Sequence, residues 1–256
     1  MANIPTISMS PEIAMHIGSM PLSNANLATM AATLILGISI IAFRQRISVI
    51  PGRMQVIMEG LLMFYYNGLV SAYGSESRAK RQLPLILGLF LFILVCNQFT
   101  IIPLTQSIVL GDTPLFRAPT SHFSLTVAFA LIVVIVSHVI AFTTSPLRHI
   151  GNFIKLHLFF KVRSFKDLAN ALLENFLSIL DIIGEFAKII SLSARLFGNV
   201  FAGEVMVAVI SGLSVYTQFI VPVPFYVLSV FSGFIQALVF SILAMSFISG
   251  MAKSVE

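Results

Sequence analysis

The sequence predicts an all-α, multi-pass membrane protein with five transmembrane helices and one further helix at the membrane interface. Only 10% of the 256 residues are charged and 57% are hydrophobic, with a mean hydropathy of +0.98. A soluble domain carries about 25% charged residues, so lipid must solvate most of this chain. Apolar runs of roughly 20 residues, the length that crosses a bilayer, recur between basic segments.

The amino-terminal end predicts a tail followed by a first span. Residues 1–24 contain three prolines and are expected to form an external tail. The run Leu27–Phe43 is apolar and ends at Arg44, the first basic residue of the chain. A signal peptide would need a basic region before its apolar stretch, so we expect this run to be retained as a span.

Residues 54–73 are apolar enough to cross the membrane, but basic residues both precede and follow them. A crossing would put one basic cluster on the wrong side, whereas a helix lying at the interface keeps both clusters on one side. We favour the interfacial helix over an additional crossing at residues 54–73. The second span, Leu83–Ile102, then completes a region that covers residues 25–104.

The third span, Phe123–Thr143, defines a region at residues 122–145, and a long helical pair follows at residues 168–251. Within that pair the run Leu168–Leu213 contains no proline. As one helix it would be roughly 69 Å long, against a bilayer core of about 30 Å. An upright crossing is therefore excluded, which leaves a steep tilt, an end outside the membrane, or a hidden bend. The last helix is expected at Phe225–Met251.

The distribution of basic residues predicts the orientation. Of the 15 lysines and arginines, six lie from Arg44 to Arg81 and five from Arg148 to Lys166. The positive-inside rule puts both segments in the cytoplasm. Five crossings follow, with the amino terminus outside and the carboxyl terminus inside.

Composition and motifs exclude several other classes. Cys96 is the one cysteine, so no intramolecular disulfide can form. The net charge of +5 is spread between apolar runs, so no nucleic-acid partner is expected. No G-x-x-x-x-G-K-[ST], H-E-x-x-H or G-x-S-x-G motif is present, which argues against a nucleotide site, a metalloprotease and a serine hydrolase. We expect no cofactor, no metal and no catalytic site within this chain alone.

Ionisable residues gather on the long proline-free run. Steps of three or four residues place five polar side chains on one helical stripe: Asp181, Glu185, Lys188, Arg195 and Asn199. Glu204 lies nine residues after Arg195, half a turn round and about 14 Å along. The last helix adds a second polar stripe with Ser229, Ser232 and Gln236. Polar groups inside a membrane are costly and rarely face lipid.

This pattern suits ion transfer. Carboxylates exchange protons with water, whereas an arginine stays protonated and can attract a partner's carboxylate while blocking a direct leak. For Asp181, Glu185 and Lys188, simple pairing between helices explains the charges equally well. The alternatives to a channel are a secondary transporter that binds an anion at Arg195, which would be expected to show paired interrupted helices, and an intramembrane enzyme.

The segment from Ser191 to Glu204 reads SLSARLFGNVFAGE, which closely resembles the signature of subunit a of F-type ATP synthases. Nearly the whole chain shares the resemblance, including the break at Pro51–Gly52, the NQFTIIP run that begins at Asn97, and IQALVF around Gln236. The resemblance implies a membrane hairpin followed by two long, strongly tilted helices that pack against a rotating ring of c subunits.

Roles for individual residues follow from the resemblance alone. Arg195 matches the essential arginine that faces the ring carboxylate, and Asn199 and Gln236 match polar residues beside it. Glu204 matches a half-channel carboxylate, and Asp181 an acidic group nearer the other channel mouth. Glu185 shares the stripe of Asp181 and is a further candidate. Asn97 matches a polar residue at the end of the second span. The implied partners are the c-ring, the peripheral stalk b subunits, F1 indirectly, and the lipid bilayer.

Three positions depart from the family pattern. Ser229 stands where many bacterial members have a histidine, and Thr100 replaces an acid found in some members. His122 falls near a loop position that is acidic in some relatives; we favour a surface histidine over an entrance residue there, and a packed core role for His138. Glutamate rather than histidine at position 204 resembles bacterial or plastid members and not mitochondrial ones, and we favour a bacterial inner membrane over a plastid thylakoid. Proton and sodium remain alternatives for the ion.

Overall fold

The fold is a set of long helices joined by short segments. A computed structural model describes residues 13–17, 20–98, 109–110, 113–114, 118–153, 165–213 and 221–254. The elements in chain order are β1 Ile13–Ile17, β2 Met20–Ser23, α1 Asn24–Arg44, α2 Arg53–Tyr73, α3 Glu76–Gln98, β3 Val109–Leu110, β4 Thr113–Pro114, η1 Pro119–Ser121, α5 Phe123–Thr144, α6 Pro146–Phe153, α7 Phe165–Leu213 and α8 Pro222–Lys253. The four short strands form two antiparallel pairs, β1 with β2 and β3 with β4.

The helices confirm a multi-pass membrane protein. Among the described residues, α1, α3, α5 and α8 are each long and apolar enough to cross a bilayer. The long helix α7 is the fifth expected crossing and is not one of these four. Helix α2 is also not among the four, and its place at the interface stays a prediction.

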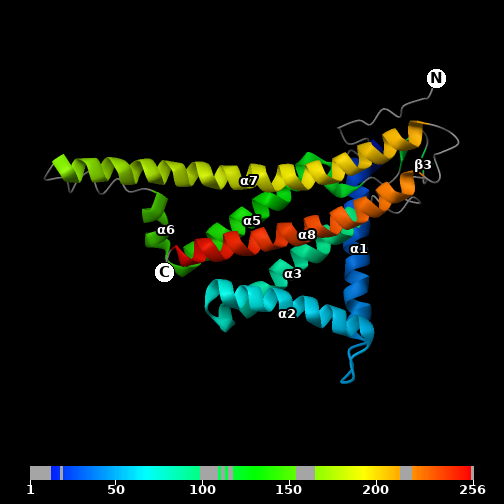
Figure 1. Ribbon diagram of the computed structural model, residues 1–256, viewed down its shortest axis with the longest axis horizontal. Coiled ribbons are helices and arrows are strands. Elements are labelled where there is room, and N and C mark those ends of the chain that lie inside the picture. Colours follow the sequence, from blue (N-terminus) through cyan, green and yellow to red (C-terminus); the bar gives the residue numbers. More distant parts are fainter. Residues whose placement is uncertain are drawn as a thin grey trace.

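Helix α7 is continuous over 49 residues, about 73 Å. No interruption shortens the helix, so its length still requires a steep tilt, an end outside the membrane, or a bend within the continuous helix. Figure 1 shows α7 running along the long axis of the molecule, with its amino-terminal end projecting beyond the carboxyl terminus of α8. The same view shows α1 running crosswise to both α7 and α2.

Helices α7 and α8 pack antiparallel in a register that polar contacts define. Asn199 on α7 bonds to Ser232 on α8. One turn further along α7, Gly203 lies against Ser229, which is three residues earlier on α8. In the other direction the Lys188 ammonium lies 5.2 Å from the centre of the Phe247 ring. The pair is therefore in contact over most of the length of α8.

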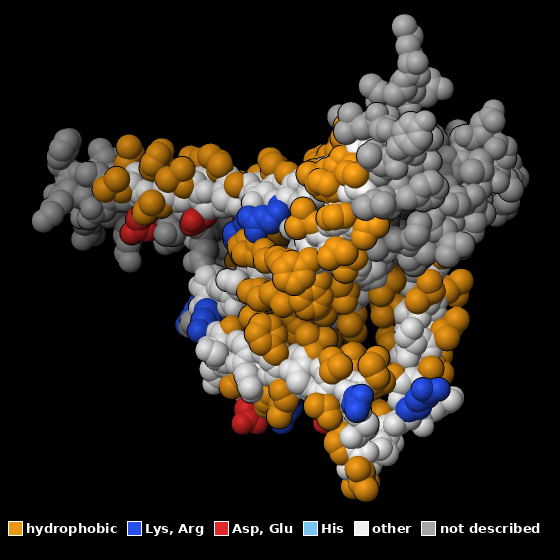
Figure 2. Space-filling view, turned by 45° about the vertical axis from the view of Figure 1, so that its right-hand side comes forward, with side chains coloured by type: hydrophobic (Ala, Val, Ile, Leu, Met, Phe, Trp, Pro, Cys, Tyr) orange, Lys and Arg blue, Asp and Glu red, His pale blue; other side chains and the backbone are white. Residues whose placement is uncertain are grey.

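The core lies where α2, α3, α5, α7 and α8 meet. Its fully buried members come from all five helices and include Tyr65, Phe90, Val133, Leu196 and Phe240. Helix α1 packs separately, through Ala28, Ala32 and the buried Cys96 of α3. Figure 2 shows that hydrophobic side chains cover most of the described surface on this face, with charged groups in a few small patches. Such a surface suits lipid or partner subunits.

Helix α2 is anchored to α8 rather than to α1. The Tyr65 hydroxyl lies 2.5 Å from Ser241 Oγ, and both groups are buried. One turn on, a Cβ at Gly68 would lie 3.1 Å from Met245 Cε, so the helices are close there. Helix α2 ends at Gly74, whose φ of +66° favours glycine.

Two predicted features are wrong. Helix α3 begins at Glu76, seven residues before the expected start at Leu83, and it continues through Pro84. Glu76 in the first turn favours a helix start, and Pro84 removes only one backbone donor. His122 is 3% exposed, so it is not a surface histidine. The expected end of the second span at Ile102, and Thr100, lie outside the described residues.

Candidate functional site

Arg195 lies near the middle of α7, on its outward side. Its neighbours Leu192 and Leu196 are buried in the core, whereas Arg195 itself is exposed. Among the residues that the structure describes, Arg195 makes no hydrogen bond or ion pair. An arginine surrounded by apolar helices needs a carboxylate or water as a partner. In this fold that partner must come from outside the described chain.

One helical turn from Arg195, Asn199 joins α7 to α8. Ser232 Oγ donates to Asn199 Oδ1 at 2.6 Å, and Asn199 Nδ2 donates to the Ser232 carbonyl at 3.2 Å. The expected polar stripes of the two helices therefore meet. Because these bonds satisfy both side chains in an apolar setting, they hold the backbone of α7 at a set distance from α8 next to Arg195.

Gln236 lies at the height of Arg195. It is four residues after Ser232 on α8, and Arg195 is four residues before Asn199 on α7, so the antiparallel register places them opposite each other. The Gln236 side chain is 6% exposed, and its Nε2 has no hydrogen-bond partner within the described chain. An unsatisfied buried amide costs about 1–3 kcal/mol, which a water or a passing ion would offset.

Glu204 lies on a different side of α7 from Arg195. It is half-buried, nine residues further on, so the two side chains point away from each other about 14 Å apart along the helix. Beside it, a Cβ at Gly203 would lie 3.2 Å from Ser229 Oγ. The position that departs from the family pattern is therefore a close approach of α7 and α8, where the small serine fits.

The residues in the amino-terminal part of the polar stripe on α7 lie in two different environments. Lys188 Nζ lies 2.6 Å from Glu185 Oε1, and the Glu185 side chain is only 15% exposed. The pairing expected as an alternative for these two residues is thus present. Asp181 is exposed and makes no contact of this kind in the described part of the chain. The structure therefore brings Glu185 and Lys188 together and leaves Asp181 on the outer face.

Two further polar contacts come from other helices. Asn97 at the end of α3 is buried, and its Nδ2 donates to the carbonyl of Gly233 on α8 at 3.0 Å. The rings of His138 on α5 and His149 on α6 are 5.3 Å apart. Sequence reasoning treated His138 as a core residue and did not single out His149. No sequence motif links them, because α6 is a short helix whose position depends on tertiary packing.

The fold and these residues define a class: an all-helical membrane protein with ionisable groups along an antiparallel pair of long helices. A model of the family described as ATP synthase A chain matches residues 26–249. That match covers most of the chain, so the chain belongs to the ATP synthase A chain family.

Individual relatives agree with this membership. The chain is 34% identical to ATP synthase subunit a of Moorella thermoacetica over 234 residues, covering 91% of this chain and 93% of the relative. It is 33% identical to ATP synthase subunit a of Geotalea daltonii over 217 residues, covering 85% and 82%. The resemblance found in the sequence is confirmed, and it assigns the chain to an ATP synthase complex, in which ATP synthesis is linked to proton transport.

Proposed function

We propose that this chain is the ion-translocating subunit of a bacterial F-type ATP synthase, with two proton half-channels that meet at Arg195 against a rotating ring of c subunits. Protons enter one half-channel and neutralise a ring carboxylate, which then turns through lipid. The site loses its proton into the second half-channel and meets Arg195. Glu204 belongs to one half-channel, and Asp181 and Glu185 belong to the other.

The observation that carries this proposal is that Arg195 is exposed and its charge is unpaired among the described residues. The side chain is exposed on the outward side of α7, and its charge has no partner within the described chain. A structural arginine in this position would be expected to pair with a neighbouring helix. A permanently charged group with an open side is suited to attract a deprotonated carboxylate that arrives from another subunit.

The exposed face of α7 supports a helical partner. It carries a run of large apolar side chains that no described element covers: Leu172, Leu173, Phe176, Leu177, Ile179, Leu180, Ile183, Phe186 and Ile190. This run continues along the helix towards Arg195. A ring of apolar helices would cover the run and present its carboxylate at the arginine. The peripheral stalk b subunits are the partners proposed for α1, whose Leu34, Ile38 and Ile41 are likewise exposed.

The positions of Arg195 and Glu204 support two separate paths. A proton that reaches Glu204 is on the opposite side of α7 from the arginine and about 14 Å away along the axis. Glu185 lies about 15 Å from Arg195 in the opposite direction. Carboxylates on both sides of one fixed positive charge provide two access routes that the charge keeps apart. The positive-inside rule supports a cytoplasmic position for the Glu185 end.

The test is Arg195→Ala in inverted bacterial membrane vesicles, with ATP-driven proton pumping and passive proton leak measured together. We expect pumping to vanish while the complex remains assembled. The control is Arg46→Ala, which removes another exposed arginine from the turn after α1 and should leave pumping unchanged. Pumping by Arg195→Ala at the parental rate would sink the proposal and favour a structural or anion-binding role.

A further inference from the structure

Three helices bring titratable side chains together at the end of the bundle where α5 turns into α6. His138 lies six residues before the end of α5, and His149 lies in the middle of α6. Their rings are 5.3 Å apart and nearly perpendicular, at 82°. Glu185 of α7 is close enough for its charge to act on His149. The cluster formed by His138, His149 and Glu185 is separate from Arg195, about 15 Å further along α7.

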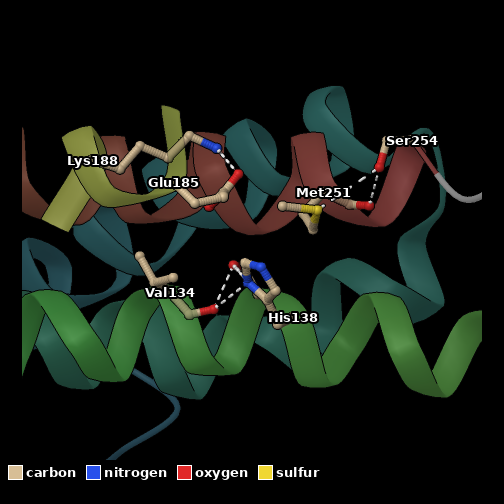
Figure 3. A network of polar contacts seen from close by, with 7 residues as sticks. Val134, His138, Glu185, Lys188, Met251 and Ser254 are labelled. Atoms are coloured by element: carbon tan, nitrogen blue, oxygen red, sulfur yellow. Dashed lines mark hydrogen bonds and ion pairs between the residues drawn. The ribbon is translucent and has the colours of Figure 1, made fainter. Parts of the chain in front are cut away.

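The cluster is largely enclosed by the surrounding helices. His149 is 7% exposed and Glu185 is 15% exposed in its side chain. Figure 3 shows the His138 imidazole projecting from α5 towards the side on which the Glu185–Lys188 pair and Met251 of α8 lie. Glu185 Oε1 accepts from Lys188, whereas Glu185 Oε2 is buried without a hydrogen-bond partner among the described residues. A buried carboxylate oxygen in this state is an acceptor site for a water or a proton.

The hydrogen bond of His138 sets its tautomer. His138 Nδ1 lies 2.9 Å from the carbonyl oxygen of Val134, and a carbonyl can only accept. Nδ1 therefore carries a hydrogen, and Nε2 is the acceptor of the neutral ring. A ring that is held by one nitrogen and accepts at the other can take and release a proton without leaving its rotamer.

We propose that His149, together with His138 and Glu185, is the proton-exchange site through which protons pass between cytoplasmic water and the half-channel beside Arg195. The proposal rests on the proposed function and adds residues that line its cytoplasmic entrance. A water donates a proton to one ring nitrogen of neutral His149, and the proton passes by way of His138 or a water to Glu185. Outward transfer uses the same groups in reverse.

The charges around His149 suit this exchange. Burial and then the nearby His138 lower the pKa of His149 below its ordinary value of 6.5, and the Glu185 carboxylate opposes this shift. The lowered pKa favours the neutral form of His149, which is the form that accepts a proton. Other charged groups on the elements around it include Lys188, paired with Glu185, and Asp181 one turn earlier on α7, Arg148 on α6 itself, and Lys253 at the end of α8.

The experiment uses inverted vesicles stripped of F1, so that the medium bathes the face that is cytoplasmic in the cell. A potassium diffusion potential drives protons inwards, and the medium pH is varied while the internal pH is held constant. We expect His149→Gln to lower the proton flow on the order of tenfold at high medium pH, and by less in acidic medium. Imidazole added to the medium should restore the flow, which a merely structural role would not allow.

Variants of the two neighbouring residues test the direction in which the pH dependence of the proton flow shifts. His138→Gln removes a group that lowers the pKa of His149, so the pH dependence of the flow should move to higher pH. Glu185→Gln removes a group that raises it, so the dependence should move to lower pH. The matched control is His122→Gln, which changes a buried histidine at the other end of α5 and should leave the dependence on medium pH unchanged.

Three results with His149→Gln would each overturn the proposal. The first is a parental rate and pH profile in His149→Gln. The second is a uniform loss at every medium pH that imidazole does not restore. The third is a profile that follows the internal pH instead of the medium pH. If His149→Gln fails to assemble, the other two variants decide. The proposal is then overturned if His138→Gln and Glu185→Gln shift the pH dependence of the flow in the same direction. This test measures passive proton flow without ATP, whereas the Arg195→Ala test measures ATP-driven pumping. A negative result for the His149 site can therefore be distinguished from a negative result for the proposed function.

Discussion

Asn199 and Ser232 exchange two hydrogen bonds across α7 and α8, one from side chain to side chain and one from side chain to backbone. This double contact lies one turn from Arg195 and at the centre of the antiparallel pair. It connects packing to function, because any change in the separation of α7 and α8 at this height also moves the arginine.

The two members of this contact should differ in their effect. Ser232→Ala removes only the side-chain bond, since Asn199 Nδ2 still donates to the Ser232 carbonyl. Asn199→Ala removes both bonds, so we expect it to lower ATP-driven pumping more. In membrane proteins such bonds contribute about 0.6 kcal/mol on average and at most ~1.7 kcal/mol, which sets the scale of the difference.

The measurement is a double-mutant cycle on pumping rate in inverted vesicles, normalised to the amount of assembled complex. The double variant should match Asn199→Ala alone, because Asn199→Ala already removes the side-chain bond that Ser232→Ala would break. Additive losses in the double variant would show that the two side chains act independently, contrary to the contact described.

The Tyr65–Ser241 contact allows a second prediction of unequal effects. Ser241 Oγ donates to the carbonyls of Ala237 and Leu238, so the Tyr65 hydroxyl is the donor between the two side chains. Tyr65→Phe leaves Ser241 satisfied and should cost about 0.5–1.5 kcal/mol. Ser241→Ala leaves a buried phenol without an acceptor and should cost more, about 1–3 kcal/mol.

Stability is best followed as loss of this subunit from the detergent-solubilised complex on heating. Tyr66→Phe, which removes a hydroxyl from the adjacent position on α2, provides a control for the substitution itself. Equal losses in Tyr65→Phe and Ser241→Ala would contradict the assigned direction of the hydrogen bond.

Hydrophobic patterning predicted the bounds of those helices whose ends are marked by prolines in the sequence. Helix α5 was expected at Phe123–Thr143 and ends one residue later, because Pro119 and Pro146 lie just outside its apolar run. The length of α7 followed from the absence of proline. The start of α3 was missed because its first turns are basic and polar, and Pro84 drew the boundary inwards.

The residues of the candidate site likewise fall into those that the sequence predicted and those that only the structure reveals. Arg195, Asn199, Glu204 and Gln236 were found from spacing and resemblance, because they lie on two helices with regular periodicity. The contact of His138 with His149 depends on the turn between α5 and α6 and on packing against α7, which no local pattern encodes. The burial of His122 likewise depends on η1 lying against α7.

Close packing of α3 and α8 at Gly233 yields a third prediction. A Cβ there would lie 3.2 Å from Asn97 Cβ and 3.9 Å from the Asn97 carbonyl oxygen. Because Asn97 Nδ2 also donates to the Gly233 carbonyl, Gly233→Ala must displace this bond as well as the helices. We expect destabilisation of about 1–3 kcal/mol and less assembled complex. Gly88→Ala on α3 has nothing within 4 Å and should be neutral or slightly stabilising, which provides the control.

Gln236 should matter for proton transfer and little for stability. Its amide is buried opposite Arg195 with Nε2 unsatisfied among the described residues, so Gln236→Leu removes a group that is costly to bury. Replacing such a group by an apolar one of similar shape is close to neutral for folding. The thermal stability of the complex should therefore be unchanged or higher.

Pumping by Gln236→Leu should nevertheless fall, on the order of tenfold, because the polar group at the height of the arginine is lost and water is less well held there. Gln236→Glu should fall further, since a carboxylate placed opposite Arg195 would pair with it and compete with the carboxylate of the partner ring. Pumping rate and melting of the solubilised complex are measured on the same preparations. Loss of stability in step with loss of pumping in Gln236→Leu would instead mark Gln236 as a packing residue, and the polar path beside Arg195 would have to run along α7 alone.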